Sequence, residues 1–234
     1  MTVQEIVNQL KKLGNAGYKN TMLKHGAQEP VFGVKIEEMK KIQKRIKKDY
    51  QLALDLYDTG IYDAMYLAGL IADDEKMTKK DLQRWMKTAR SPMIAEYTVP
   101  WVASGSPSGF DLALEWIDSK DEATAAAGWA TLTSWIATKD DSELDLGQLK
   151  QLLSRVQKSI HQAQNRVKYS MNTFVIGLGS YVKPLSEAAM KAAEKIGEVS
   201  INMVGDCKVP YAPEYIRKVQ DRGTIGKKRK SAKC

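Results

Sequence analysis

The sequence predicts an all-α fold, an α-solenoid built from stacked antiparallel helix pairs. Three observations support this prediction. Apolar residues recur at spacings of three and four along most of the chain, helix-breaking residues interrupt that pattern at short intervals, and no sustained two-residue alternation occurs. The chain has 234 residues, of which 43% are hydrophobic and 27% are charged, which suffices for a sizeable core.

The clearest helices are predicted at residues 146–160 and 36–46. The first has a single apolar stripe, made by Leu146, Leu149, Leu152, Leu153, Val156 and Ile160. The second has a similar stripe, and its other faces and the two residues after it are rich in basic side chains, namely Lys40, Lys41, Lys44, Arg45, Lys47 and Lys48. Shorter helices with the same period are predicted at residues 111–119 and 187–197.

Glycine, proline and capping residues divide the chain into these helices. Ser91 is predicted to cap a helix whose first residue is Pro92, and Lys183-Pro184 ends one helix and begins the next. Two helices together span about 25–40 residues, which is the length of one helical-hairpin repeat. This pattern favours HEAT-like helix pairs whose inner faces line a concave groove, and a plain multi-helix globule is the alternative.

The positive charge of the chain is concentrated at its C-terminus. The formal net charge is +8, and residues 216–234 contain eight Lys or Arg against one Asp. Residues 1–215 are therefore predicted to form a single domain, and residues 216–234 a basic tail that suits a polyanion. Within this tail, the run Lys227, Lys228, Arg229 and Lys230 is the candidate nucleic-acid contact, with a solubilising role as the alternative.

Several functional classes are not supported by the sequence. There is no apolar run of about 18 residues and no signal peptide, so we expect a cytoplasmic protein with no membrane segment. Two cysteines (Cys207 and Cys234) and two histidines (His25 and His161) show no ligand spacing, so we expect no metal. No phosphate-binding loop or nucleophile motif is present, and we expect no cofactor and a monomer.

The helix predicted over residues 161–179 has an unusual polar face. Its buried stripe leaves Lys168, Tyr169 and Asn172 on another face, with Arg166 at the edge. Arginine, asparagine and tyrosine side chains on an exposed face suit phosphate and base-edge contacts. The alternative for each residue is structural: a surface ion pair for Arg166 and partial burial for Tyr169.

Glu96 is the candidate catalytic residue. It lies between apolar residues, shortly before Pro100, which predicts a kink or an early helix end, and Trp101. A carboxylate near aromatic rings can stabilise a cationic substrate or an oxocarbenium ion. Trp101 and Trp129 are candidates for stacking on a base or deoxyribose, and the alternative for each is burial in the core.

Four segments resemble a large bacterial branch of the DNA alkylation repair family. They are "EYTVPWVAS", "AGWATL", "HQAQNRVKYSMN" and the C-terminal "CKVPYAPEYIRKVQDRGTIGKKRKSAKC". The resemblance implies a curved solenoid of HEAT-like helix pairs that cradles duplex DNA. In the best-studied branch it implies a glycosylase that releases cationic N3- and N7-alkylpurines, using two Trp, an Asp and an Arg.

This sequence departs from the catalytic pattern of that branch. The Asp position corresponds to Glu96 or a near neighbour, and one Trp position falls near Pro92. The other Trp position falls near Asn172, and the Arg position falls at Ala125 or Ala126. We therefore expect a DNA-binding protein with duplex DNA as its partner. The alternatives are an active alkylpurine glycosylase with Glu96 as electrostatic catalyst and a protein-interaction scaffold.

Overall fold

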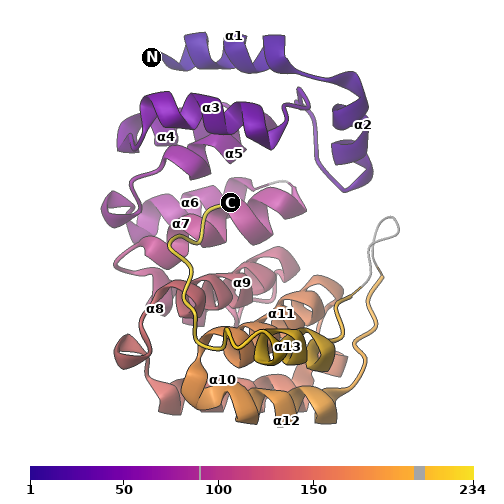
Figure 1. Cartoon of the computed structure of the whole chain (residues 1–234). Helices are drawn as coiled ribbons and strands as arrows, with labels where there is room; N and C mark the ends of the chain where they lie inside the picture. Colours follow the sequence, from indigo (N-terminus) through magenta and orange to yellow (C-terminus); the bar gives the residue numbers. More distant parts are fainter. Residues whose placement is uncertain (90, 203–208) are drawn as a thin grey trace. The chain divides into compact units, whose positions relative to one another are not determined.

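Helices make up almost all of the regular structure of this chain (Figure 1). The structure is a computed structural model that describes residues 1–89, 91–202 and 209–234. Within these ranges it contains helices α1 to α13, short 3-10 turns and one π-helical turn, and no β-strand. The prediction of an all-α fold is confirmed.

The helices fall into two compact units. Unit 1 comprises Met1–Gly109 together with Lys233–Cys234, and unit 2 comprises Phe110–Ala232. A single domain over residues 1–215 stays a prediction. The proposed start of the tail at residue 216 lies inside a helix, where Ile216 is fully buried.

Unit 1 is organised around a helix that is buried along its whole length. Its helices are α1 (Val3–Leu13), α2 (Ala16–Lys24), α3 (Ile36–Ile46), α4 (Tyr50–Asp58), α5 (Tyr62–Ile71), α6 (Lys79–Thr88) and α7 (Val99–Gly105). Every residue of α5 is buried, and α1, α3, α4 and α7 pack against it. Asp63 of α5 accepts hydrogen bonds from the backbone N–H groups of Phe32 (2.6 Å) and Val34 (2.8 Å), which fixes the segment before α3.

The segment before α7 contains the irregularity that Pro100 predicts. Ile94–Thr98 forms a π-helical turn that runs directly into α7. Proline has no backbone N–H, so residue 100 cannot donate to the carbonyl of Glu96, and the wider turn accommodates the missing bond. Ser91 occupies the position before this helix, which begins at Pro92 as predicted, and its carbonyl accepts from the backbone N–H groups of Ile94 (3.0 Å) and Ala95 (2.9 Å). Its hydroxyl oxygen accepts a hydrogen bond from the backbone N–H of Gln28 (3.0 Å).

Unit 2 is built on two long helices that pack along each other. Its helices are α8 (Gly109–Trp116), α9 (Glu122–Thr138), α10 (Leu146–Ser159), α11 (Asn165–Tyr181), α12 (Ser186–Ile196) and α13 (Ala212–Asp221). α9 and α11 share the longest interface, and α12 and α13 pack on α11. The rings of Trp129 and Phe174 lie 5.2 Å apart, centroid to centroid, within this core.

The residues after α13 return to the end of α9. The backbone N–H of Arg229 donates to the carbonyl of Ala137 at 2.7 Å. The side-chain amine of Lys228 donates to the carbonyl of Ile136 (2.9 Å) and lies 2.7 Å from Oδ1 of Asp141. These carbonyls belong to the last turn of α9, which has no intrahelical donors left for them. Part of the predicted tail therefore caps the C-terminal end of α9 in unit 2.

Candidate nucleic-acid interface

Neighbouring segments fix the start of α11, which carries the polar face noted in the sequence. Asn165 donates from Nδ2 to the carbonyl of Asn202 (2.6 Å) and accepts at Oδ1 from the backbone N–H of Asn202 (2.6 Å). The backbone N–H of Arg166 donates to Oε1 of Glu122 at 2.7 Å. The bond to Glu122 satisfies a backbone N–H in the first turn that a helix leaves without an internal partner, and the Asn165 bonds hold the start of α11 against Asn202.

Arg166 and Tyr169 form a preorganised pair on this helix. The guanidinium carbon of Arg166 lies 5.1 Å from the centroid of the Tyr169 ring. Both residues are partly exposed, as is Lys168 between them. An arginine held over an aromatic ring loses little further side-chain freedom when its N–H groups bind a phosphate. This part of α11 therefore combines two cations with an aromatic surface.

Asn172 has a structural contact instead of a free side chain. It is 2% exposed, and its Nδ2 donates to the carbonyl of Pro210 at 2.8 Å. The expectation that Asn172 contacts nucleic acid does not fit this position, because the amide is buried and already used. Its bond ties α11 to the residues that lead into α13.

α13 carries an exposed aromatic and cationic stripe that the sequence analysis missed. Tyr211 and Tyr215 are 40% and 47% exposed, and they rank among the few large hydrophobic side chains at the described surface. The amine of Lys218 lies 5.0 Å from the centroid of the Tyr215 ring. Residues 211, 215, 218 and 222 recur at spacings of four, three and four, so they share one face of the helix.

The α13 stripe and the α11 pair belong to packed elements. α11 and α13 contact each other directly, and Pro210, which accepts from Asn172, is the residue before Tyr211. Tyr169 lies one turn before Asn172 on α11. We call Arg166, Lys168, Tyr169, Tyr211, Tyr215 and Lys218 the α11–α13 surface. The signal in the sequence was "YAPEYIRK", where two tyrosines four residues apart precede two cations.

Glu96 and Trp101 lie together in unit 1, but both are buried. Glu96 is in the π-helical turn and is 5% exposed. Trp101 packs edge-to-face on Tyr66 at 5.6 Å and contacts the ring of Tyr97 at 6.4 Å, both measured between ring centroids. π-helical turns are frequent at functional sites, and a buried carboxylate can stabilise a positive charge, which is the chemistry expected of Glu96.

Trp129 is a core residue. Its side chain has no exposed surface, and it contacts Phe174 on one side while the guanidinium of Arg155 lies 5.8 Å from its ring centroid. A fully enclosed ring cannot stack on a base, so the alternative of burial in the core describes Trp129 in this structure.

The basic run of the C-terminus divides into two kinds of residue. Lys227, Arg229 and Lys230 are exposed, whereas the amine of Lys228 is held by Asp141 and Ile136. The exposed three remain candidate contacts for a polyanion. Lys228 instead stabilises the fold through these two contacts.

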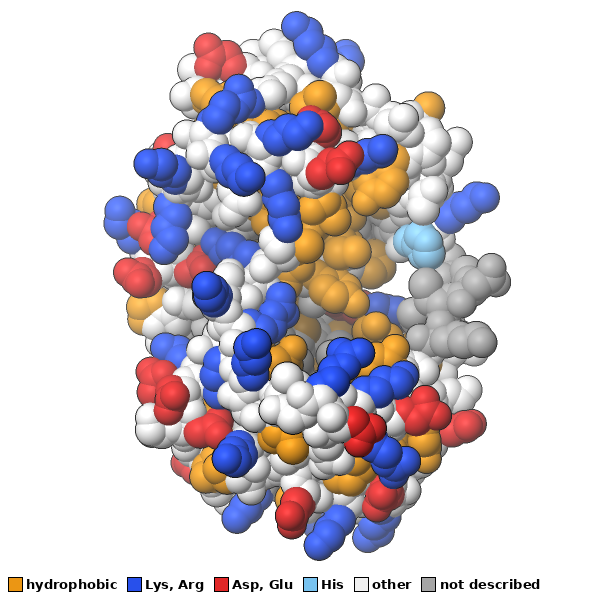
Figure 2. Space-filling model, viewed as in Figure 1, with side chains coloured by type: hydrophobic (Ala, Val, Ile, Leu, Met, Phe, Trp, Pro, Cys, Tyr) orange, Lys and Arg blue, Asp and Glu red, His pale blue; other side chains and the backbone are white. Residues whose placement is uncertain are grey.

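Unit 1 carries a second concentration of positive charge. Lys and Arg side chains gather over α1 and α3 on the face seen in Figure 2. Some of them have polar partners: Lys41 pairs with Glu38 at 2.6 Å, and Arg45 donates to the side chain of Gln9 at 2.8 Å. Lys44 and Lys47 are exposed, and Lys40 is partly buried.

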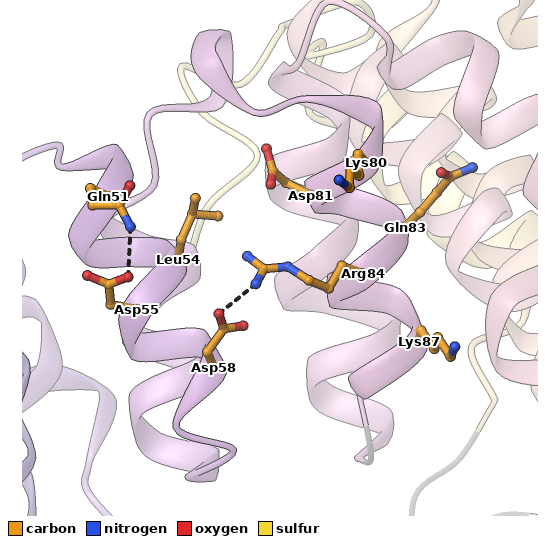
Figure 3. Close-up of a pocket in the computed structure, with 9 residues that line it drawn as sticks. All are labelled: Gln51, Leu54, Asp55, Asp58, Lys80, Asp81, Gln83, Arg84 and Lys87. Atoms are coloured by element: carbon orange, nitrogen blue, oxygen red, sulfur yellow. Dashed lines mark hydrogen bonds and ion pairs between the residues drawn. The ribbon is translucent and has the colours of Figure 1, made fainter.

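A cavity of about 740 Å³ between α4 and α6 is lined by charges that neutralise one another (Figure 3). Arg84 pairs with Asp58 at 2.6 Å, and Asp55 accepts from Gln51 at 2.7 Å. Asp81 accepts from the hydroxyl of Tyr50 at 2.9 Å and caps the start of α6. The cavity is also lined by the exposed Lys80 and Lys87, so its three acidic and three basic side chains balance, and no excess of either charge defines a ligand.

The residues that the structure describes contain neither a metal-binding cluster nor a membrane-spanning helix. No group of three or more His, Cys, Asp or Glu side chains is arranged to hold a metal ion within those ranges. None of the helices described has both the length and the apolar composition needed to cross a membrane. Cys207, one of the two cysteines, lies outside the described residues.

Comparison with solved structures gives a match over the whole chain. A structure described as a new family of proteins related to the HEAT-like repeat DNA glycosylases, with affinity for branched DNA structures, superposes with a TM-score of 0.93. The two chains are 36% identical, and all of each chain is covered. The predicted architecture of HEAT-like helix pairs is confirmed by this match.

Comparison with known sequences identifies the family. The uncharacterized protein Lin0241 of Listeria innocua is 29% identical over 228 residues, which is 95% of this chain and 99% of that protein. The uncharacterized protein Lmo0209 of Listeria monocytogenes matches with the same identity and coverage. The family model described as DNA alkylation repair enzyme matches residues 6–216. The chain therefore belongs to the DNA alkylation repair enzyme family.

Proposed function

We propose that this protein binds DNA through the α11–α13 surface and that it binds branched DNA more tightly than linear duplex. The observation that carries the proposal is the exposed pairing of cations with aromatic rings on two packed helices. Arg166 lies over Tyr169, and Lys218 lies over Tyr215. The monomeric state and the cytoplasmic location expected from the sequence are kept as parts of this proposal.

Each component of the surface suits a different part of a nucleic acid. Arginine and lysine neutralise phosphates and release counterions, which supplies affinity that is independent of sequence. Exposed tyrosine rings stack on bases that have left the duplex, and every base offers a face for such stacking. Unpaired or distorted bases occur where DNA strands branch, so a surface with both components favours branched DNA over a fully stacked duplex.

The related protein of known structure supports the proposal that the partner is DNA. Its description records affinity for branched DNA structures, and it shares 36% of its residues and the whole of its fold with this chain. Exposed tyrosines occur at protein interfaces as well, so it is the recorded DNA affinity of this relative that favours nucleic acid. The rings of Tyr211 and Tyr215 would supply the stacking surface for such a partner.

The proposal is tested by comparing two DNA ligands of equal length and base composition. A fluorescently labelled four-way junction and a linear duplex are titrated with the purified full-length protein, and anisotropy is measured at 50 to 200 mM salt. The proposal predicts tighter binding to the junction and a steep, linear fall of log K with log salt for both. Equal affinity for the two DNAs would contradict the preference for branches, and absence of binding would contradict the proposal as a whole.

A second candidate function rests on Glu96. This carboxylate is buried in a π-helical turn, in the same segment as the Tyr97 and Trp101 rings, and a buried carboxylate can stabilise a cationic sugar. The test is release of free methylated purine from duplex DNA carrying N7-methylguanine or N3-methyladenine. Release above spontaneous depurination that is lost in Glu96→Gln would support glycosylase activity, and equal release in that variant would exclude Glu96 as the catalyst.

A further inference from the structure

A basic groove lies in unit 2, between α10 and α12. These helices run side by side in Figure 1 and pack against each other. The groove has a volume of about 400 Å³ and is lined by Lys150, Leu153, Ser154, Gln157, Ala188, Lys191, Ala192 and Lys195. None of these eight residues is acidic. Three lysines on two helices therefore face one cavity.

The charge of this groove is not neutralised by the protein. Lys150, Lys191 and Lys195 are exposed, and within the described parts of the chain none of them forms an ion pair. The cavity of Figure 3 is the opposite case, because its Arg84 is paired with Asp58. A concentration of like charge destabilises the folded protein slightly, so an anion that enters the groove relieves repulsion as well as gaining attraction.

Two acids of α12 lie close to these lysines in the sequence, Glu187 and Glu194. Glu194 lies beside Lys195 in the sequence, but its Oε1 is 3.9 Å from the guanidinium of Arg217 on α13. Glu187 lies one turn before Lys191 and is exposed, and in the described residues it forms no ion pair with a groove lysine. The groove is also separate from the α11–α13 surface in its residues, since the two share none.

We propose that the α10–α12 groove binds the phosphate backbone of a second DNA segment while the α11–α13 surface holds the first. This inference rests on the proposed DNA-binding function and deepens it by naming where another arm of a branched DNA binds. Charge complementarity supports this occupant, because three unpaired lysine amines match a row of phosphates. The hydroxyl of Ser154 and the amide of Gln157 add uncharged donors of the kind that position a DNA backbone.

The floor of the groove fits the same occupant. Leu153 and Ala192 are buried, and Ala188 is small and exposed. Such a floor gives the sugar rings of a backbone an apolar surface without obstructing its approach. Lys191 and Lys195 are one helical turn apart, about 6 Å along the axis, so they reach successive positions along one strand.

The test uses a triple variant, Lys150→Gln, Lys191→Gln and Lys195→Gln, and a control with the same change of charge elsewhere in unit 2. The control is Lys139→Gln, Lys158→Gln and Lys183→Gln, since these residues lie outside the groove. Thermal unfolding first establishes that both variants are folded. Affinity for the four-way junction and for the linear duplex is then measured at several salt concentrations.

The proposal predicts a selective loss in the groove variant. Its affinity for the junction falls about tenfold, and the slope of log K against log salt becomes shallower by about 2.7, the value for three lost phosphate contacts. Its affinity for linear duplex, and both affinities of the control variant, stay within about twofold of the wild type.

Two results would overturn the proposal while leaving the proposed function intact. Unchanged junction binding in the groove variant would show that no DNA lies there, and an acidic protein partner would become the better occupant. An equal loss for junction and duplex would make the groove part of a single binding surface. Failure of the wild-type protein to bind either DNA would overturn the proposed function and this inference together.

Discussion

The amine of Lys233 lies 2.7 Å from Oδ1 of Asp74 and donates a hydrogen bond to the carbonyl of Ala72 at 2.8 Å. Both partners are largely buried, and burial lowers the pKa of the Lys233 amine and raises the pKa of the Asp74 carboxyl. Lys228 makes a matching contact with Asp141 and Ile136 in unit 2. In each unit, a C-terminal lysine therefore binds a helix end and the aspartate that follows it.

Replacing Lys233 with Met is expected to destabilise the protein by about 2 kcal/mol, because the Asp74 carboxylate would be left buried without its counter-charge. Urea unfolding of the full-length protein measures the change. Lys230→Met is the matched control, since Lys230 is exposed and the expected effect is close to zero. Equal free energies of unfolding for the wild type and Lys233→Met would show that the pair does not contribute to stability.

The basic run before Lys233 is expected to separate into a structural and a binding part. Lys228→Met lowers the free energy of unfolding, because its amine holds Asp141 and a carbonyl of α9. Lys227→Gln with Lys230→Gln leaves stability unchanged and makes the salt dependence of DNA binding shallower by about two phosphate contacts. A salt slope identical to that of the wild type in this double variant would remove the exposed lysines from the interface.

The tyrosines of α13 are expected to act through their rings. Tyr211→Leu with Tyr215→Leu should weaken junction binding by about 1–3 kcal/mol for each base that stacks. The double Tyr→Phe variant keeps the rings and should bind as the wild type does. Because both side chains are 40% or more exposed, neither double variant should lose much stability. Similar losses of affinity in the Leu and Phe variants would point to the hydroxyl groups instead of stacking.

Asp81 predicts a pH dependence of stability. Burial alone would raise the pKa of its carboxyl, but hydrogen bonds from the Thr78 and Tyr50 hydroxyls outweigh burial and hold the pKa below its ordinary value of 3.8. The ionised carboxylate therefore contributes stability that is present above about pH 4 and is lost as pH falls through the lowered pKa of the folded state.

Asp81→Asn should consequently be less stable than the wild type by about 1 kcal/mol at pH 7, with the difference shrinking below pH 4. Thermal unfolding from pH 2.5 to 7 follows it. Asp55→Asn lies in the same cavity and is exposed, so it serves as a control with little effect at any pH. A difference between Asp81→Asn and the wild type that stays constant over this range would contradict the assignment.

Much of the helical framework could be predicted from local pattern. The apolar stripe of residues 146–160 corresponds to α10, and Gly14, Gly60 and Gly197 lie at or next to helix ends, where glycine is common. Pro100 predicted an irregularity, and a π-helical turn lies directly before it. These features depend on residues close in sequence. The Ser91 bond to Gln28 spans 63 positions, so no local pattern could indicate it.

The candidate interface was predicted less well, for a physical reason. A polar side chain on a helix is available to a ligand only if it does not already bond to a distant segment of the chain. The Asn172 amide is hydrogen-bonded to the carbonyl of Pro210, and the Lys228 amine is paired with the carboxylate of Asp141. Both contacts join residues that are far apart in the chain. The Arg166–Tyr169 pair, three residues apart on one helix, follows from local spacing alone. The stripe on α13 was overlooked although its period was readable in the sequence.

The most direct test of the account removes the α11–α13 surface. Arg166→Gln, Lys168→Gln, Tyr211→Leu and Tyr215→Leu are combined, since the backbone bond from Arg166 to Glu122 survives these changes, and folding is checked by thermal unfolding. Junction binding by the wild type and this variant is compared by anisotropy at 100 mM salt. The account predicts a loss of at least about a hundredfold in a folded protein. Undiminished binding by the folded variant would contradict it.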